Sequence, residues 1–261
     1  MDNRHRNPTF LTINSHDPSG GAGIVADVET AASLGCHCFS AVTALNVRDT
    51  QQHKDRQSSP ASLLIEQVRA ALEDGSIHAI KIGDIGSVAQ VEAVHTILED
   101  YPDLPVVIDP VLHHGANDGD VNVAIRLLLL PRATVTILSR DHIRALSNSA
   151  DSLSAATQEL FESGGDFLLI TDAAAQPGHL QNRLYSPKGV IKEYVWECLP
   201  DRFHGAGSTL SAAVTAYLAH GFDLFEALQQ SQQFTWQALQ NARQLGMGCK
   251  VPDRLFWARD K

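Results

Sequence analysis

The chain has 261 residues, of which 44% are hydrophobic, and this is enough to bury a full core in one α/β domain. Its formal net charge is −10 at pH 7 and no run of Lys and Arg stands out. This balance argues against an extended contact with nucleic-acid phosphates or an anionic membrane. We therefore expect a small-molecule partner, with no nucleic acid and no membrane.

The first ten residues are polar and precede only a short apolar run, which fits neither a signal peptide nor a membrane-spanning helix. The four cysteines are too few and too scattered for a disulfide framework, so reduced thiols are expected. These features predict a cytoplasmic protein that forms one domain over residues 1–261, with residues 1–8 as a flexible N-terminus.

Short apolar runs alternate with segments of helical periodicity along most of the chain. The runs predicted as strands are Phe10–Asn14, Phe39–Leu45, Ile77–Ile82, Val106–Asp109, Ala133–Leu138 and Phe167–Thr171. The segments predicted as helices are Ile24–Leu34, Ala61–Leu72, Val88–Leu98, Val121–Leu130 and Ser152–Phe161. This alternation predicts an α/β fold with a mostly parallel central sheet and helices on both faces.

The last third of the chain has a different pattern. Leu180–Ser186 and Val190–Trp196 flank the turn signal SPKG, which predicts an antiparallel hairpin near one edge of the sheet. Two helices are expected after it, at about residues 208–220 and 224–245. The first of them opens with the glycine-rich sequence HGAGST.

Three loops that follow strands are candidate sites, because open parallel sheets bind ligands beyond the carboxyl ends of their strands. In SHDPSGGAG the glycines let backbone amides approach a ligand, and Asp17 can accept hydrogen bonds from a hydroxyl or an amine; a plain connection is the alternative. In HGAGST the free amides of a helix start form an anion site, or Ser208 or Thr209 simply caps the helix. Asp109 ends a strand, where it can hold a metal ion or form a turn.

Several segments in this order resemble the hydroxymethylpyrimidine/phosphomethylpyrimidine kinases of the ribokinase superfamily over nearly the whole chain. They are DPSGGAGIVAD, VTAL, KIGDIGS, VVIDPV, LLLPRATV and HGAGSTLSAAVTAYLAHG. The resemblance implies a ribokinase-like fold and the use of ATP with Mg²⁺. It also implies phosphorylation of the hydroxymethyl group of an aminopyrimidine, and then of the resulting monophosphate, in thiamine biosynthesis, by a homodimer.

The resemblance also assigns roles to residues. It places Asp17 and Ala22 in the substrate pocket and Asp109 beside Mg²⁺. The residues that it places around the transferring phosphoryl group are Gly205, Ala206, Gly207 and Ser208. Ser208 replaces the cysteine to which the family assigns activation of the substrate hydroxyl, and a serine hydroxyl is a far weaker base than a thiol of pKa about 8.5. Because phosphoryl transfer relies chiefly on positioning and charge neutralisation, we expect this change to slow turnover without abolishing it.

The positions expected to contact the nucleotide also differ from the family. Ser139 and His142 replace an Asn-x-x-Glu motif that organises magnesium and phosphate, and an imidazole is a poor substitute for a carboxylate around a hard cation. Thr171 and Asp172 stand where the family often has a lysine or a glycine-rich turn that meets the ATP phosphates. Asp172 would repel a triphosphate unless it is turned away or paired.

Three departures fall in the expected pyrimidine pocket. Arg48 replaces a Gln or Glu, Asp84 replaces a methionine that packs on the ring, and Ser15 replaces a glycine. Because burying either charge alone would cost several kcal/mol, we hypothesise that Arg48 and Asp84 form an ion pair that narrows or fills the pocket. The alternative is that each side chain faces water.

Three functions therefore compete. The first is an ATP-dependent kinase of hydroxymethylpyrimidine or its phosphate, which family membership favours. The second is a binding or regulatory protein that kept the fold and lost catalysis, as the substituted positions suggest. The third is a kinase of another alcohol, pyridoxal-like or anionic, that Arg48 would accept. All three share one fold, so the fold cannot choose between them.

Overall fold

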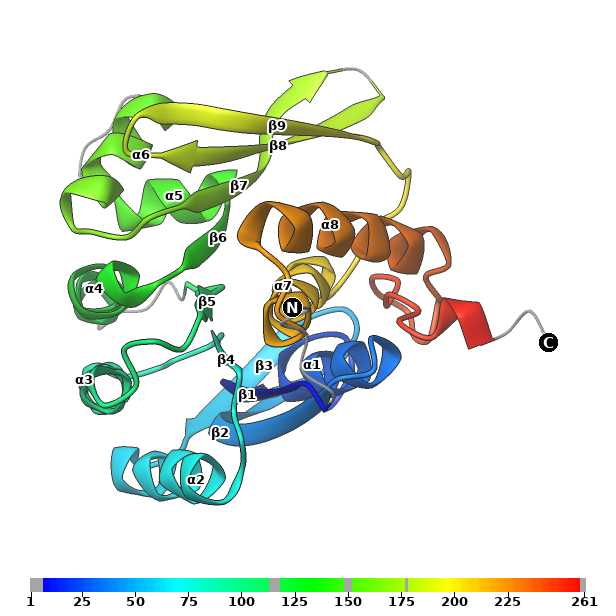
Figure 1. Cartoon of the computed structure of the whole chain (residues 1–261). Coiled ribbons are helices and arrows are strands. Elements are labelled where there is room, and N and C mark those ends of the chain that lie inside the picture. Colours follow the sequence, from blue (N-terminus) through cyan, green and yellow to red (C-terminus); the bar gives the residue numbers. More distant parts are fainter. Residues whose placement is uncertain (1–6, 113–117, 148–151, 177, 259–261) are drawn as a thin grey trace.

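This computed structural model describes residues 7–112, 118–147, 152–176 and 178–258 of the chain. Its nine described strands form one sheet in the order β3-β2-β1-β4-β5-β6-β7-β8-β9 (Figure 1). Strands β2, β1, β4, β5, β6 and β7 are parallel neighbours, whereas β3 at one edge and β8 and β9 at the other pair antiparallel. The strands are β1 (Thr9–His16), β2 (His37–Arg48), β3 (His53–Ser58), β4 (Ala79–Ile82), β5 (Val106–Ile108), β6 (Val135–Ser139), β7 (Leu168–Gln176), β8 (His179–Ser186) and β9 (Gly189–Glu197).

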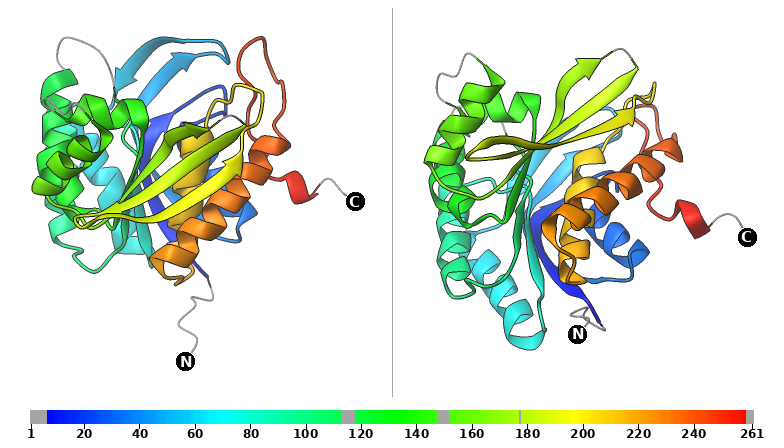
Figure 2. Two further views of the ribbon diagram at one scale, coloured as in Figure 1. Left: turned by 90° about the horizontal axis from the view of Figure 1, so that it is seen from above. Right: turned by 45° about the horizontal axis from the view of Figure 1, so that its top comes forward.

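Helices cover both faces of this sheet (Figures 1 and 2). One face carries α1 (Gly23–Ser33), α7 (Ala206–Ala219) and α8 (Leu224–Gln240). The other carries α2 (Ala61–Asp74), α3 (Val88–Glu99), α4 (Asp118–Ala124), α5 (Arg140–Leu146) and α6 (Leu153–Glu162). Each face has its own apolar core, and β1 supplies Leu11 and Ile13 to one and Phe10 to the other, as expected of a strand buried on both sides.

The predicted α/β class, all six predicted strands, the hairpin and the predicted helices are present. The predicted helix over 121–130 is α4 followed by a π-helical turn, Ile125–Leu129, and α8 ends at Gln240 rather than near residue 245. The pattern missed β3 and α5. Strand β3 reads HKDRQS and has no apolar residue to mark it, so only its antiparallel pairing with β2 defines it.

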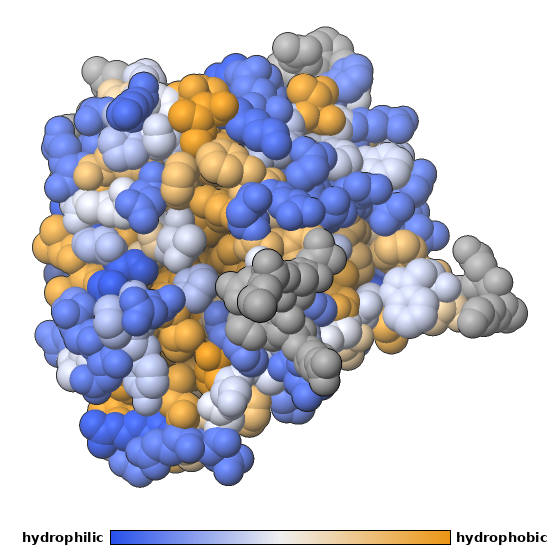
Figure 3. All heavy atoms as spheres, in the orientation of Figure 1, coloured by the Kyte–Doolittle hydropathy of each residue, from blue (hydrophilic) through white to orange (hydrophobic). Residues whose placement is uncertain are grey.

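The surface, the helices and the N-terminus bear on the remaining expectations from the sequence. On the face seen in Figure 1, hydrophilic side chains cover much of the surface, with apolar side chains showing between them (Figure 3). None of the described helices is both long enough and apolar enough to cross a membrane. The flexible N-terminus expected at residues 1–8 falls mainly on residues 1–6, which lie outside the described residues.

A buried ion pair joins the elements beneath the carboxyl edge of the sheet. Lys81 of β4 pairs with Asp27 of α1, and both side chains are completely buried. Thr12 and Asn14 of β1 also donate hydrogen bonds to Asp27 Oδ2, at 2.6 and 2.9 Å. Because a buried carboxylate needs its partners, this cluster fixes α1 against β1 and β4.

Replacing Lys81 by Met should therefore lower the free energy of unfolding by about 3–5 kcal/mol, because Asp27 is left as an uncompensated buried charge. Equilibrium unfolding in guanidinium chloride measures this change. The double variant K81M/D27N removes both charges and should be more stable than K81M alone. A double variant no more stable than K81M would contradict the role given to the pair.

Candidate functional site

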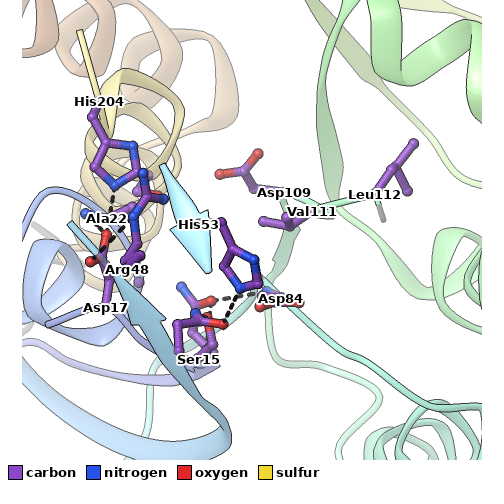
Figure 4. A pocket seen from close by; sticks show the side chains of 15 residues that line it. Ser15, Asp17, Ala22, Arg48, His53, Asp84, Asp109, Val111, Leu112 and His204 are labelled. Atoms are coloured by element: carbon purple, nitrogen blue, oxygen red, sulfur yellow. Dashed lines mark hydrogen bonds and ion pairs between the residues drawn. The ribbon is translucent and has the colours of Figure 1, made fainter. Parts of the chain in front are cut away.

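A cavity of about 360 Å³ lies beyond the carboxyl ends of β1, β2, β4 and β5 and against the start of α7 (Figure 4). The chain leaves β1 toward β2 on one side, and β4 lies on the other side, so the cavity sits at a switch point of the sheet. The residues expected in a site that line it are Ser15, Asp17, Ala22, Arg48, Asp84, Asp109 and Ser208.

Asp17 is the anchor of the glycine-rich loop between β1 and α1. Its side chain is only 2% exposed, and Oδ1 accepts hydrogen bonds from Ser19 N and Ser19 Oγ at 2.8 and 2.7 Å. Oδ2 accepts from Ala22 N at 3.1 Å and lies 2.6 Å from His204 Nε2. Burial alone would raise the pKa of Asp17, but the hydrogen bonds from His204 and Ser19 outweigh it and lower that pKa to about 2. Because the carboxylate can only accept, His204 Nε2 must be the donor.

The second glycine-rich segment forms the start of α7. Gly205 has φ 98°, a left-handed conformation that favours glycine, and α7 begins at the next residue. The backbone amides of residues 206–208 have no acceptor among the described residues, as expected of the first turn of a helix. Asp109 lies beside this turn, because a Cβ at Gly207 would be 3.7 Å from Asp109 Oδ2, and its carboxylate accepts a hydrogen bond from Ser211 Oγ at 2.8 Å. Free amides and a carboxylate thus border the same space.

The predicted ion pair between Arg48 and Asp84 is wrong. Asp84, 4% exposed in its side chain, instead pairs with Arg56 at 2.9 Å, and Arg56 comes from β3, the strand that the sequence pattern missed. Arg48 Nε lies 3.8 Å from Asp17 Oδ1 and donates to Asp49 O at 3.3 Å. Each charge therefore has an opposite charge nearby, but from a different residue than the sequence suggested.

Two asparagines that the sequence did not single out, Asn14 and Asn46, also line the cavity and form hydrogen bonds there. Asn14 Oδ1 accepts from the backbone amides of Ser15 and Asp84, both at 2.9 Å, and Asn46 Nδ2 donates to Ser15 Oγ at 2.9 Å. His53 and His204 also line the cavity. His204 opens the HGAGST motif and could have been singled out there, whereas His53 reaches the cavity only through the pairing of β3 with β2.

A second cavity of about 220 Å³ lies between the β7–β9 strands and helices α7 and α8. Ala206 and Gly207 line it, whereas Ser208 lines the first cavity, so the two cavities meet at the start of α7. Its remaining lining is mostly apolar and amide side chains, with two indole rings: Leu180, Asn182, Trp196, Leu210, Gln232, Thr235, Trp236 and Leu239. This lining suits a flat, mostly apolar group beside the free amides of α7.

The four residues expected at the nucleotide divide into two pairs. Thr171 and Asp172 line the second cavity, and Asp172 adopts φ 54°, with its amide donating to Asn182 Oδ1 at 3.0 Å. Asp172 therefore has a left-handed backbone conformation, which glycine would adopt without strain, at a position where the resembled family often has a glycine-rich turn. Ser139 and His142 line neither cavity, and Ser139 Oγ accepts from His142 N to cap the start of α5.

The residues present fit ATP and magnesium in part. The free amides of α7 suit a phosphate, and the second cavity suits a base. Among the described residues, no Lys or Arg lines the second cavity, and no group of three His, Cys, Asp or Glu side chains can hold a metal ion. Asp109 would therefore hold Mg²⁺ only together with phosphate oxygens and water, which is how this ion is usually bound.

Known proteins match this chain over most of its length. The family model described as phosphomethylpyrimidine kinase matches residues 17–253. A hydroxymethylpyrimidine/phosphomethylpyrimidine kinase of Mycobacterium bovis is 32% identical, over 95% of this chain and 94% of the relative. Both matches extend over nearly the whole chain.

Solved structures agree on the fold. Pyridoxal kinase from Staphylococcus aureus in complex with pyridoxal has a TM-score of 0.88 and 26% identity, over 98% of this chain and 97% of the other. The same enzyme in complex with ADP has a TM-score of 0.87 and 26% identity, with the same coverage. Phosphomethylpyrimidine kinase from Clostridium difficile 630 has a TM-score of 0.75 and 24% identity, over 90% of this chain and all of the other, and shows the same ribokinase-like fold. With the family model matching most of its length, this chain belongs to the phosphomethylpyrimidine kinase family.

Proposed function

We propose that this chain is an ATP-dependent kinase of hydroxymethylpyrimidine or its monophosphate. The observation that carries the proposal is that two cavities meet at the start of α7, one bordered by Asp17, Asp109 and Ser208 and the other by indole and apolar side chains. An alcohol in the first cavity and a nucleotide in the second would place donor and acceptor on either side of the same free amides. Such positioning is the main requirement of phosphoryl transfer.

Each part of the first cavity has a task in this proposal. Asp17, held as a carboxylate, already accepts four hydrogen bonds from Ser19, Ala22 and His204, so its task is to fix the wall of the cavity that Ala22, Ser15 and His204 form around the alcohol. The amides of Gly207 and Ser208 stabilise negative charge on the transferring group, with the positive end of the α7 dipole behind them. Mg²⁺ held near Asp109 by phosphate oxygens would neutralise charge on the phosphates.

Of the residues around the transferring group, Ser208 contributes least to catalysis in this proposal. Its hydroxyl cannot serve as a base near neutral pH, whereas a thiol of pKa about 8.5 at the start of a helix is partly ionised. The chain should therefore transfer phosphate slowly, through positioning and charge neutralisation alone.

The first experiment is calorimetric titration with Mg²⁺-ATP and with hydroxymethylpyrimidine, followed by an assay of phosphoryl transfer in the wild type, S208C and S208A. We expect both ligands to bind and S208C to raise kcat by about 100-fold, the usual scale of general-base catalysis. S208A is the matched control and should resemble the wild type, because Ser208 supplies no base. No binding of either ligand would reject the proposed function, and loss of all activity in S208A would reject this role of Ser208.

The role of Asp17 requires that it be charged in the folded protein. Because its pKa falls from 3.8 to about 2, the folded state is favoured at pH values above 4 and this stabilisation is lost as the pH falls from about 4 to 2. We expect the wild type to lose about 2 kcal/mol more than D17N in the free energy of unfolding over that interval. Urea unfolding at several pH values between 2 and 6 measures the difference. If the free energy of unfolding falls equally with pH in the wild type and D17N, Asp17 does not have the lowered pKa given to it here.

A second candidate substrate class has its own support. Arg48 lines the first cavity, its side chain is 19% exposed, and none of the described residues accepts a hydrogen bond from its two Nη groups. These groups are therefore available to an anionic or pyridoxal-like alcohol, and the Staphylococcus aureus enzyme of the same fold was solved with pyridoxal.

Replacing Arg48 by Gln should separate neutral from anionic substrates. If the substrate is an anionic alcohol, R48Q should weaken its binding by about 10-fold or more, the scale of a hydrogen bond to a charged group, and leave hydroxymethylpyrimidine binding little changed. Competition titrations with the neutral hydroxymethylpyrimidine, with pyridoxal and sugar alcohols, and with the anionic hydroxymethylpyrimidine monophosphate measure this. Equal effects on neutral and anionic ligands would exclude an anion-specific role of Arg48.

A further inference from the structure

One residue near the C-terminus, Arg254, reaches back to both glycine-rich segments of the site. Its side chain is completely buried. Nη1 donates to Gly20 O at 3.2 Å, Nη2 donates to Gly21 O, and Nε donates to Thr209 Oγ1 at 3.0 Å. A single planar guanidinium therefore joins the loop after β1 to the first turn of α7.

The contact continues to the residue that precedes the helix. Thr209 Oγ1 donates in turn to Gly205 O at 2.8 Å. A Cβ on Gly205 would overlap Gly21 O, and a Cβ on Gly21 would overlap the ring of His204. The two segments thus touch backbone to backbone, and their spacing is set by contacts that leave no room for a side chain.

Arg254 acts from behind the site rather than within it. It lines neither cavity, so it contacts neither the proposed alcohol nor the proposed nucleotide. Its fourth partner is Glu29 of α1, at 2.8 Å from Nη1, and the Glu29 side chain is 46% exposed. Burial lowers the pKa of the Arg254 guanidinium, and the hydrogen bond and charge of Glu29 oppose that shift.

Anchoring of the C-terminal segment does not account for these bonds. That segment is held independently, because Arg243 and Val251 exchange two backbone hydrogen bonds at 2.9 Å and Asp253 N donates to Ala238 O at 3.0 Å. Cys249 N also donates to Thr50 O at 3.0 Å, where the C-terminal loop lies against the turn between β2 and β3 (Figure 2). The Arg254 bonds to the glycine carbonyls are additional to these anchors.

We propose that Arg254 is a positioning residue that sets the separation between the Asp17 loop and the free amides of α7. Its kinetic consequence rests on the proposed function, whereas its effect on the two segments can be measured without catalysis. A guanidinium suits this task because its donors are fixed in one plane, so one group dictates the relative position of three acceptors.

The test uses Arg254→Met and, as a smaller change, Thr209→Val with Thr209→Ser as its matched control, because serine keeps the hydroxyl that links Arg254 to Gly205. Glu29→Gln controls for loss of the exposed ion pair alone. Hydrogen-exchange mass spectrometry of peptides covering residues 17–23 and 204–209 is the readout. We expect amide exchange in both segments to rise by about 10-fold or more in R254M and T209V, because losing the link between Arg254 and Thr209 lets the two segments open locally. Exchange should stay unchanged in T209S and E29Q, which keep that link.

The kinetic readout separates positioning from general stability. If the wild type transfers phosphate, R254M should lower kcat by about 100-fold, the cost of misplacing reacting groups by about 1 Å, with KM within about threefold of the wild type. If the wild type transfers none, the proposed function fails and the exchange data alone decide the proposal. If R254M does not fold, T209V against T209S decides it. Unchanged exchange in T209V, or an equal rise in E29Q, would overturn the positioning role.

Discussion

The close contact between the loop after β1 and the start of α7 is the constraint on which the site depends. These segments lie almost 190 residues apart in the chain, and they meet through glycine backbone at Gly21 and Gly205. On the cavity side, His204 donates to the Asp17 carboxylate, and on the buried side Arg254 bonds to the glycine carbonyls. Fixing both segments before a ligand arrives removes an entropic cost that binding would otherwise carry.

The same region pairs the charged side chains that stand at the departures from the resembled family. Asp84 and Arg48 stand at two positions where the resembled family has other residues, and each has an opposite charge within 4 Å, Arg56 for one and Asp17 for the other. Gly86 leaves the space that the Arg56 guanidinium fills, since a Cβ there would overlap it. This part of the cavity therefore offers hydrogen-bonding groups to a ligand in place of an apolar side chain that could pack on a ring.

The departures from the resembled family affect the two halves of the site unequally. On the side of the alcohol, the charged carboxylate of Asp17 and the free amides of α7 remain. On the side of the nucleotide, Asp172 has a left-handed backbone, but none of the described residues that line the cavity is basic, and Ser139 caps a helix. The geometry for positioning is therefore preserved better than the charge that would neutralise phosphates. The expected homodimer and cytoplasmic location stay predictions.

The sequence by itself determined the fold class and the three candidate loops that follow strands, because apolar periodicity marks buried strands and glycine clusters mark close backbone approach. The resemblance to a known family, and not these patterns, supplied most of the individual site residues. The sequence also identified Asp17, Asp109 and Ser208 as residues that share one site, and the structure places all three around one cavity. Only the tertiary structure decided which charges pair and what holds the two glycine segments together. Strand β3 has no apolar residue that marks it in the sequence, so the pairing of Asp84 with Arg56 could not be predicted. Arg254 contacts glycine carbonyls that lie more than 200 residues away in the chain. Ion pairs and hydrogen bonds form between groups that the fold brings close, and distance along the chain carries no signal of that proximity.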